Sequence, residues 1–402
     1  MGVTIALYSH DSTGLGHGRR NRAIAHALAD QLPALMGEPV GGVLIAGHPD
    51  LARDPLPTGW DWLVLPGVAP ADPGHHRPRN LAMSLGELVA VRGAVMDAAL
   101  AALNPDLLIV DRHAFGVAGE LRSTLPWLRD RGCRVVLGLR EVLDDPHTIA
   151  EEWRELGGAA SVAAAYDALW IYGDPEVYDP RLTGEVPLPL RRLARTTGYL
   201  SLGRPESGGS ECQSGSDVLT LLGGGADGGA LARISVQAQA PAGHRHLVVT
   251  GPQMSGPEVE QIRRLAPTGT TVLTHIDDLP SRIEDAAAVV CMGGYNTVAE
   301  VLATSTPALV VPRHHRRKEQ SRRAEALAAA RAVDTRRLDD LTTAEISQFF
   351  ATSIGRRVDR SHIDRQGLSR VPELAAALLQ RHREQVGASP IQHRDEVDSH
   401  AG

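Results

Sequence analysis

Short, continuous apolar runs alternate along this chain with longer stretches in which apolar and polar residues recur at helical spacing. Continuous apolar runs are typical of strands that are buried on both faces of a parallel sheet. They predict strands at 3–8, 43–46, 62–65, 107–110, 135–139, 169–172, 218–222, 247–250, 271–274, 288–291 and 308–311. The clearest helical stretches are 19–32, 86–103, 297–303 and 319–329. Strand and helix alternate in both halves, which predicts an α/β protein with two doubly wound, Rossmann-like domains.

The boundary between the halves is a polar segment rich in glycine and serine at 201–216, which has the composition of a linker. A chain of 402 residues also exceeds what one hydrophobic core usually serves. We predict a first domain at 1–200 and a second at 217–370, with a cleft between the carboxyl ends of their sheets. A final helix is predicted at 371–386, and 387–402, with few apolar residues, is expected to be a disordered tail.

Composition excludes several classes of protein. The formal net charge of −7 argues against general nucleic-acid binding, because such domains are usually basic. Cys133, Cys212 and Cys291 are too far apart for a disulfide framework or a metal-ligand pair, which fits a reducing cytosol. No apolar run resembles a signal peptide or reaches the roughly 18 residues of a membrane span, so we expect a cytoplasmic protein. Arginine almost entirely replaces lysine, which indicates a GC-rich, bacterial genome, and a lysine Schiff base would require Lys318.

The loop after the first strand, 10–18, is rich in glycine and opens a helix. Gly14 and Gly16 allow a ligand to approach the backbone closely, and the N-terminus of the helix favours an anion. The spacing is not Gly-x-Gly-x-x-Gly, so a dinucleotide is not predicted. His17 is a candidate general base, because histidine titrates near neutral pH; alternatively it only caps the helix or packs.

Two loops of the second half are candidates for nucleotide contact. Gly223, Gly224 and Gly225 directly follow a predicted strand and suit a diphosphate, with a flexible turn as the alternative. In the loop 275–280, Ile276 is a candidate to cover the face of a base, but the segment alone also fits an ordinary turn with an aspartate cap.

The motif Gly-Gly-Tyr-Asn-Thr-Val-Ala-Glu at 293–300 follows a predicted strand and starts a helix. Its helix N-terminus would face phosphate, and Glu300, one turn further, would accept both hydroxyls of a ribose. The residues of this motif that are candidates to bind a ligand are Gly293, Gly294, Asn296 and Thr297. Thr297 and Glu300 also have the spacing of a capping box, in which Glu300 only satisfies the start of the helix. The spacing alone favours neither interpretation.

The segment 312–320 is strongly basic and ends in a glutamate and a glutamine. It is either a solvated charge run or a positive lip of the cleft that includes Arg313. On the lip, Glu319 and Gln320 would hydrogen-bond the hydroxyls of a sugar. Such polar pairs suit a neutral ligand that is rich in hydroxyl groups.

Charged residues also follow two strands of the first half: Asp111 comes after 107–110, and Arg140 and Glu141 come after 135–139. They are candidates to bind an acceptor or to act as a base, and the alternatives are helix caps and surface turns. Neither an Asp-x-Asp pair nor a Gly-x-x-x-x-Gly-Lys motif is present. Diphosphate charge must then be met by amides, helix N-termini and arginines, and no metal site is predicted.

Taken together, these motifs resemble a known group. Gly-Gly-x-Asn-Thr-x-x-Glu at 293–300, with Pro-Arg and Glu-Gln-x-x-Arg-Ala-Glu after it, resembles the nucleotide-sugar half of MurG-like glycosyltransferases. A bacterial family of predicted MurG-like glycosyltransferases is similar at 14–20, 104–106, 119–121 and 139–146. The similarity covers almost the whole chain apart from the linker and the tail.

The resemblance implies a GT-B fold and an inverting, metal-independent transfer without a cofactor. It implies a first domain for the acceptor and a second domain for a nucleotide-diphosphate sugar donor, with Ile276 at the base and Glu300 at the ribose. Glu319 and Gln320 would contact the donor sugar, and His17 would lie near the acceptor. MurG has paired glutamines where this chain has Glu319 and Gln320, so the resemblance does not identify the sugar or the nucleotide.

Several alternatives stay open. A nucleotide-sugar 2-epimerase shares the architecture, and a non-catalytic partner of another transferase is a further possibility. A small soluble acceptor is favoured over a lipid-linked one, in natural-product or cell-envelope glycoside biosynthesis. The stretch 81–95 fits either a peripheral membrane contact or a buried helix. Oligomeric state is not predicted.

Overall fold

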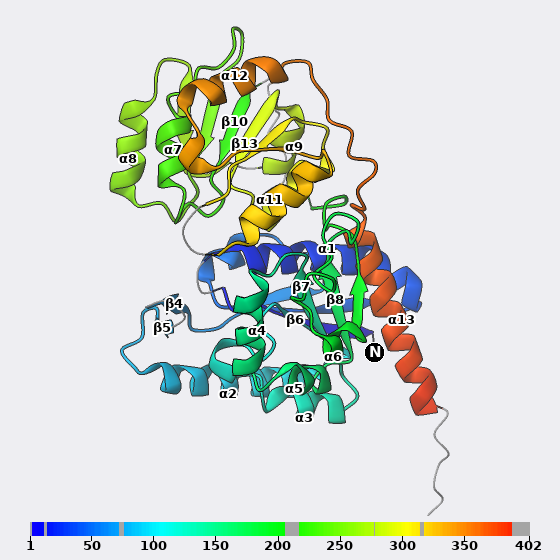
Figure 1. Ribbon diagram of the computed structural model, residues 1–402. Coiled ribbons are helices and arrows are strands. Elements are labelled where there is room, and N and C mark those ends of the chain that lie inside the picture. The colour runs from blue at the N-terminus through cyan, green and yellow to red at the C-terminus, as the bar shows by residue number, and fades with distance from the viewer. Residues whose placement is uncertain are drawn as a thin grey trace, which may run out of the picture.

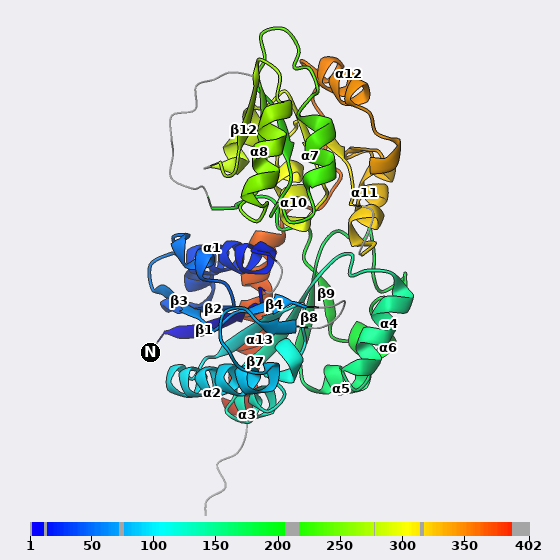
Figure 2. The same cartoon turned by 90° about the vertical axis from the view of Figure 1, so that its left-hand side faces the viewer.

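The computed structural model describes residues 2–11, 14–71, 76–205, 217–276, 278–313 and 317–387. Most of the predicted linker and nearly all of the predicted disordered tail lie outside these residues. The described chain forms two α/β domains stacked one above the other (Figures 1 and 2). They meet where α1 (Gly16–Met36) contacts α10 (Tyr295–Ala303). The predicted domain limits at 200 and 370 stay predictions.

The first sheet is parallel throughout and has the order β3-β2-β1-β6-β7-β8-β9. Its strands are β1 (Val3–Tyr8), β2 (Val40–Ala46), β3 (Trp60–Val64), β6 (Leu107–Asp111), β7 (Arg134–Arg140), β8 (Ala168–Tyr172) and β9 (Ala194–Thr196). The strand order reverses between β1 and β6, so the loops after these two strands leave the sheet side by side. Such a switch point is where open α/β sheets bind ligands.

The second sheet repeats this plan with the order β12-β11-β10-β13-β14-β15. Its strands are β10 (Val218–Leu221), β11 (His246–Val249), β12 (Thr270–Leu273), β13 (Ala288–Cys291), β14 (Ala308–Val310) and β15 (Asp334–Thr335). Its switch point lies between β10 and β13, where the predicted glycine loops at 223–225 and 293–294 begin.

Helices cover both sheets, and a small antiparallel hairpin projects from the first domain (Figure 1). The hairpin is β4 (Val68–Pro70) with β5 (His76–Pro78). The first domain adds α2 (Leu85–Leu103), α3 (Thr124–Asp130), α4 (Pro146–Glu155), α5 (Ala159–Ala164) and α6 (Leu188–Arg191). The second adds α7 (Gly229–Ser235), α8 (Gly256–Leu265), α9 (Leu279–Asp285), α11 (Glu319–Ala329) and α12 (Thr343–Ser353). Short 3-10 turns lie at Pro49–Arg53, Val117–Gly119 and Leu338–Asp340.

The last helix, α13 (Gly367–Gly387), returns to the first domain and packs along α1 (Figure 1). It starts four residues before the predicted 371 and includes the first residue of the predicted tail. Its buried Val371 and Leu379 belong to the same apolar cluster as Ile24 and Leu28 of α1. The chain therefore crosses between the domains twice, which ties them together.

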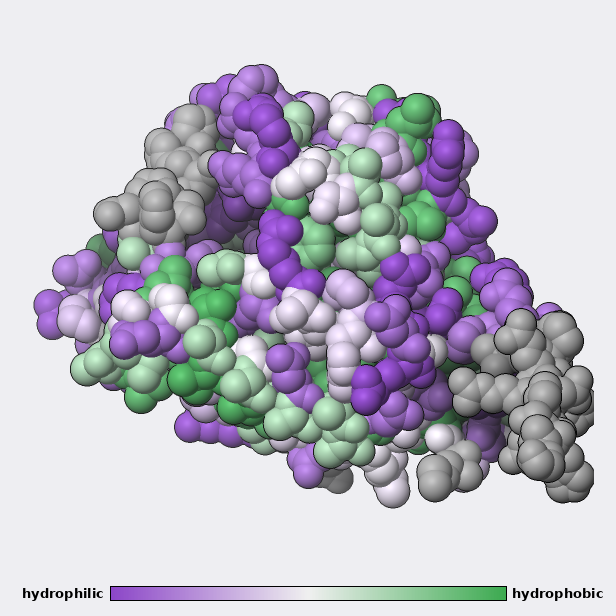
Figure 3. Space-filling model, turned by 90° about the horizontal axis from the view of Figure 1, so that it is seen from below, coloured by the Kyte–Doolittle hydropathy of each residue, from purple (hydrophilic) through white to green (hydrophobic). Residues whose placement is uncertain are grey.

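The helix α2 contains most of the stretch for which membrane contact and burial were alternatives. Its residues Leu88, Met96 and Leu100 are buried, whereas its residues Val91 and Val95 are exposed. Hydrophobic residues gather on this underside of the first domain in Figure 3. Among the described residues, no helix is both long and apolar enough to cross a membrane.

Candidate functional site

The loop after β1 is held in shape by Asp11. The Asp11 carboxylate accepts hydrogen bonds from Ser9 Oγ (2.6 Å) and from the backbone amide of Gly18 (2.9 Å). The backbone φ of Asp11 is +45°. Glycine at position 18 leaves room for the Leu51 side chain, because a Cβ atom there would lie 2.2 Å from a methyl group of Leu51. The clasp fixes how α1 begins and therefore where His17 lies.

His17 lies between the two switch-point loops of the first sheet, with 21% of its side chain exposed. Its Nδ1 is 3.1 Å from Asp111 Oδ2. Arg20, one turn along α1, donates to both oxygens of Asp111 at 2.7 and 2.6 Å. Arg20 Nη2 also lies 3.2 Å from this Nδ1. Because the Asp111 carboxylate can only accept and makes the shorter contact, we assign the ring proton to Nδ1, which leaves the lone pair of Nε2 available.

Asp111 itself has no exposed surface. Burial alone would raise its pKa, but Arg20 and His17 hold the pKa of this carboxyl well below its usual value. A buried, strongly acidic carboxyl is a poor base, and in the structure it contacts His17 and Arg20. The predicted role of Asp111 as a base or acceptor ligand stays a prediction, and its contacts fit a residue that positions His17.

Glu141, the third predicted catalytic residue, is also fully buried. Its two oxygens accept from Arg323 of α11 at 2.6 and 3.1 Å, and Arg323 also donates to the Gly293 carbonyl at 3.2 Å. Both oxygens are thus occupied by an ion pair across the domain boundary. The predicted role of Glu141 as a base stays a prediction, and in the structure the carboxylate joins the two domains.

The glycine loops of the second domain follow β10 and β13 as predicted. Gly223 and Gly225 have φ of +63° and +94°, and a Cβ at Gly225 would lie 2.3 Å from a backbone oxygen. A Cβ at Gly224 would lie 2.8 Å from the side chain of Gln253. Gly14 of the first domain also approaches Gln253, at 3.7 Å from where its Cβ would be. The loop that contains Gly14 and the loop Gly223–Gly225 therefore face each other across the domain boundary.

The helix α10 begins at Tyr295, two residues before the predicted start. Its N-cap is Gly294, without a side-chain cap, and Gly293 has φ +80°. Thr297 and Glu300 lie inside the helix, so the capping-box alternative is wrong. Free amides of the first turn remain at the switch point, where the helix dipole favours an anion.

Glu300 is buried, with 2% of its side chain exposed. Its Oε1 accepts from Arg19 Nη2 at 2.9 Å and from Arg204 Nη1 at 3.4 Å. Its Oε2 has no hydrogen-bond partner among the described residues. A buried carboxylate oxygen without a donor is costly, so a hydroxyl-bearing ligand would find an acceptor prepared for it.

Asn296 is a contact between the domains. Its Nδ2 donates to the Gly16 carbonyl at 2.8 Å, and its Oδ1 accepts from Arg204 Nη2 at 3.2 Å. The neighbouring Tyr295 ring lies between two arginines, with Arg20 at 5.3 Å and Arg323 at 5.7 Å from its centroid. Through these cation–π contacts, the motif at 293–300 is linked to Arg20, which also binds the Asp111 carboxylate next to His17.

The predicted lip is organised around Arg313, which donates to Glu319 Oε1 at 2.8 Å. The Arg313 amide donates to Gln320 Oε1 at 3.2 Å. Glu319 Oε2 has no partner among the described residues. Burial opposes its charge, yet Arg140 and Arg313 keep the pKa of Glu319 below its usual value. Residues 314–316 of the lip lie outside the described residues.

Arg140 ends β7 and faces Glu319 from the first domain. Its Nε is buried and has no hydrogen-bond partner among the described residues. Ile276 follows β12, is partly buried and packs against the apolar cluster that includes Leu247 and Ile283. The two residues thus differ in character: Arg140 is a cation that faces Glu319, and Ile276 is an apolar side chain that follows β12.

Sequence reasoning missed most of the arginines that shape the site. Arg19 and Arg20 were part of a similar motif but received no role, and Arg204 was read only as linker. His10 and His113, whose rings lie 5.2 and 5.9 Å from that of His17, were also missed. Their positions directly after predicted strands at a switch point were the available signal.

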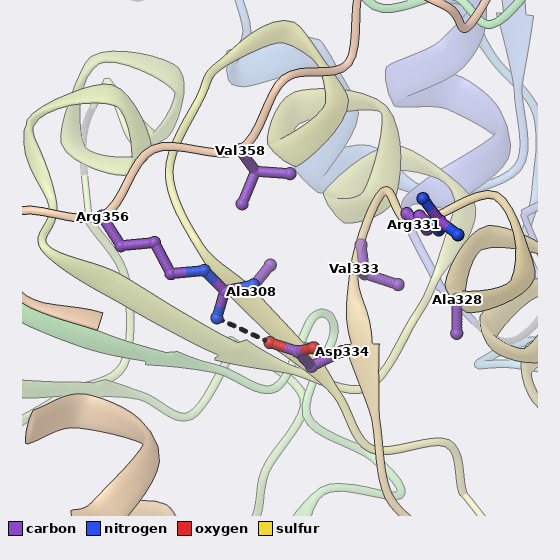
Figure 4. A pocket seen from close by; sticks show the side chains of 7 residues that line it. All are labelled: Ala308, Ala328, Arg331, Val333, Asp334, Arg356 and Val358. Carbon is purple, nitrogen blue, oxygen red and sulfur yellow. Dashed lines mark hydrogen bonds and ion pairs between the residues drawn. The ribbon is translucent and has the colours of Figure 1, made fainter. Parts of the chain in front are cut away.

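A separate hollow of about 270 Å³ opens at one edge of the second domain (Figure 4). Its lining includes the ion pair between Arg356 and Asp334, whose atoms are 3.2 Å apart. The remaining lining residues are Ala308, Ala328, Arg331, Val333 and Val358. These are not residues of the predicted site, so the hollow is not part of it.

Comparison with known proteins adds to this geometry. Residues 221–352 match the model of the glycosyltransferase family 28 C-terminal domain. No curated protein sequence matches the chain. Glycosyltransferase VinC, solved with dTDP, has a TM-score of 0.59 at 15% identity, over 95% of this chain and 100% of that one. The calicheamicin glycosyltransferase CalG4 has 0.54 at 16%, over 96% and 98%. MurG of Acinetobacter baumannii has 0.52 at 16%, over 94% and 99%.

Fold, switch-point loops and domain match define the class: the chain has the GT-B fold and is a glycosyltransferase that depends on a nucleotide sugar. More particularly, its second domain is of the family 28 type, and its fold is shared with MurG. The MurG-like resemblance and the two-domain fold predicted from the sequence are thus confirmed.

Proposed function

We propose that this protein transfers a sugar to a hydroxyl of a small soluble acceptor, with inversion at the anomeric carbon and without metal or other cofactor. The observation that carries the proposal is the orientation of His17 by Asp111 at the switch point, opposite the glycine loops of the donor domain. Several fold neighbours are named as transferases of calicheamicin, spinosyn and kitacinnamycin. This supports an acceptor of the natural-product class.

The donor is proposed to lie across the second domain. Glu300 Oε2 would accept from the ribose hydroxyls, and Ile276 would cover the base. Amides of the first turn of α10 and of the loop Gly223–Gly225 would meet the diphosphate, with Arg140 as a cation from the other domain. Glu319 and Gln320 would hydrogen-bond the sugar.

In the transfer, Nε2 of His17 takes the proton of the acceptor hydroxyl as its oxygen attacks the anomeric carbon. A glycosidic C–O bond forms, the bond to the diphosphate oxygen breaks, and the nucleoside diphosphate leaves with the electron pair. Asp111 stabilises the imidazolium that results. The amides of α10 and the arginines stabilise the charge that develops on the leaving group. The proton then passes from His17 to solvent.

The test is transfer by the wild type and by His17→Gln in a chelating buffer, with a panel of nucleotide sugars and small alcohols or phenols. We expect chelator-resistant release of nucleoside diphosphate and a product of inverted configuration by NMR. His17→Gln should lower kcat about a thousandfold at unchanged donor affinity, since general base catalysis contributes 10²–10⁴-fold. The matched control is His26→Gln on the same helix.

Three results would contradict the proposal. A product of retained configuration excludes the direct displacement, and loss of transfer in chelator excludes metal independence. Conversion of the donor to its 2-epimer without any acceptor would establish the alternative epimerase reaction. Unchanged kcat in His17→Gln would remove His17 from the base role.

A further inference from the structure

Three histidines converge at the switch point of the first sheet. His10 follows β1, His113 follows β6, and His17 lies in the first turn of α1. The ring centroids are 3.9 Å apart for His10 and His113, and 5.2 Å for His10 and His17. One ring nitrogen from each of the three lies within 4.8 Å of the others. The strand order therefore brings three imidazoles to one point.

Imidazole nitrogen is the preferred ligand of zinc and of related divalent ions, and three histidines form a common zinc set. Such an ion binds each nitrogen at about 2.0–2.1 Å, so small side-chain rotations would close the present spacing.

Asp111 supplies the outer support that such sites use. Metal-binding histidines usually donate their second ring nitrogen to a carboxylate, which fixes the tautomer and the direction of the ring. His17 makes this bond through Nδ1 to Asp111 at 3.1 Å. Its Nε2 is the nitrogen left for an ion.

The arginines around the cluster are largely neutralised by carboxylates. Arg20 binds Asp111, Arg92 binds Glu120 at 2.6 Å, and Arg112 binds Glu152. Arg317 also pairs with Glu152, at 3.1 Å. Arg79 contacts backbone carbonyls, including that of Asp11. The buried ion pairs limit the repulsion that a second positive ion would meet.

We propose that His10, His17 and His113 form a binding site for a divalent ion of the zinc class, with a fourth position open to water or substrate. This ion takes the lone pair of His17 that the transfer needs, so it inhibits the enzyme reversibly. The inhibitory part rests on the proposed function, whereas binding itself does not.

The test is titration of chelator-treated, tag-free protein with Co²⁺ alone, followed by the visible absorption of four-coordinate cobalt. We expect one saturable site in the wild type. His10→Ala and His113→Ala should each bind about a hundredfold more weakly, and Asp111→Asn about tenfold to a hundredfold more weakly, because outer partners contribute that much. His26→Ala, which removes a histidine outside the cluster on α1, should bind like the wild type, and circular dichroism checks folding.

The possible outcomes distinguish the metal site from the proposed role of His17 in transfer. Absence of the cobalt band in the wild type, or equal binding by the cluster variants and the wild type, overturns the site. If cobalt binds the cluster and Zn²⁺ leaves transfer unchanged, the site stands and His17 is not the base. If transfer depends on His17 while no ion binds, the proposed function stands and the metal site falls.

Discussion

At the scale of single residues, the first domain depends on a buried carboxylate whose charge is held by an arginine. Arg20 and Asp111 have at most 2% exposure, so neither is screened by water. Such a pair contributes little net stability, because desolvation offsets the attraction, but it fixes geometry. Here the geometry that it fixes is the direction of the His17 ring.

Replacing Asp111 by asparagine tests this role. The amide keeps the shape but no longer stabilises an imidazolium, and it can select the wrong tautomer of His17. We expect kcat to fall about a hundredfold or more, with donor affinity little changed, in steady-state kinetics and donor binding measurements. Asp97→Asn, in α2 and bonded to Thr124, should leave kcat near the wild-type value. An Asp111→Asn enzyme with normal kcat would contradict the positioning role.

His246 gives the second domain a pH-dependent stability. The ring is fully buried beside Thr220 and Phe350, and burial lowers its pKa from 6.5 to about 4. The folded state then binds fewer protons than the unfolded state between these values. Its contribution is complete above pH 6.5 and is lost as the pH falls towards 4, by roughly 3 kcal/mol in total.

Denaturant unfolding at pH 7 and pH 4.5 measures this contribution. His246→Gln should lose less stability between the two pH values than the wild type, by about 2–3 kcal/mol. His244→Gln, at a less buried position two residues earlier, should lose as much as the wild type. An identical pH dependence in wild type and His246→Gln would show that the ring is not the titrating group.

At the scale of elements, the N-terminus of α10 depends on two glycines that differ in their constraints. Gly293 has φ +80°, and a Cβ there would lie 2.7 Å from Val310 Cγ1. Gly294 has φ −61°, and no described atom lies within 4 Å of where its Cβ would be. Only Gly293 is required both by its positive φ and by the lack of room for a Cβ atom.

Alanine at the two positions should therefore have different effects. Gly293→Ala is expected to lower the free energy of unfolding by about 1–3 kcal/mol and to weaken donor binding, since the turn must shift. Gly294→Ala should lower the free energy of unfolding by well under 1 kcal/mol, about a few tenths, because the only loss is that of the glycine N-cap. Thermal unfolding and donor titration of both variants measure this, and equal losses would contradict the account of the turn.

The continuous apolar runs predicted the long buried strands well, because short runs of this kind are typical of strands buried on both faces of a sheet. The strands 3–8 and 288–291 match β1 and β13 at both ends. The hairpin β4–β5 and the short β9 and β15 were missed, because two or three residues carry no periodic signal. At 297–300 a capping-box spacing was indistinguishable from a helix interior, since tertiary packing, not local sequence, starts α10 at Tyr295.

The positions of the second-domain glycine loops were predictable, because each loop follows a strand directly. The site was not predictable where partners come from distant sequence. Arg19 and Glu300 are 281 residues apart and meet only because the domains stack. Likewise, the burial of Glu141 against Arg323 depends on α11 of the other domain.

At the scale of the whole molecule, both switch points face the domain boundary, and polar contacts cross it at the site itself. Arg19 binds Glu300, Asn296 binds the Gly16 carbonyl, and Glu141 binds Arg323. A nucleotide sugar whose hydroxyls donate hydrogen bonds to Glu300 would therefore act on contacts that hold the domains together. We therefore expect donor binding and domain arrangement to be coupled through these bonds.

The central claim is that Glu300 and the start of α10 bind the nucleotide part of a sugar donor. The most direct measurement is thermal unfolding of the wild type, Glu300→Gln and the exposed control Glu325→Gln with UDP-, GDP- and dTDP-sugars. The wild type and Glu325→Gln should be stabilised by at least one donor, by about 2.7 kcal/mol at a hundredfold excess over Kd, and Glu300→Gln should be stabilised far less. Equal stabilisation of all three proteins, or none by any donor, would contradict the account.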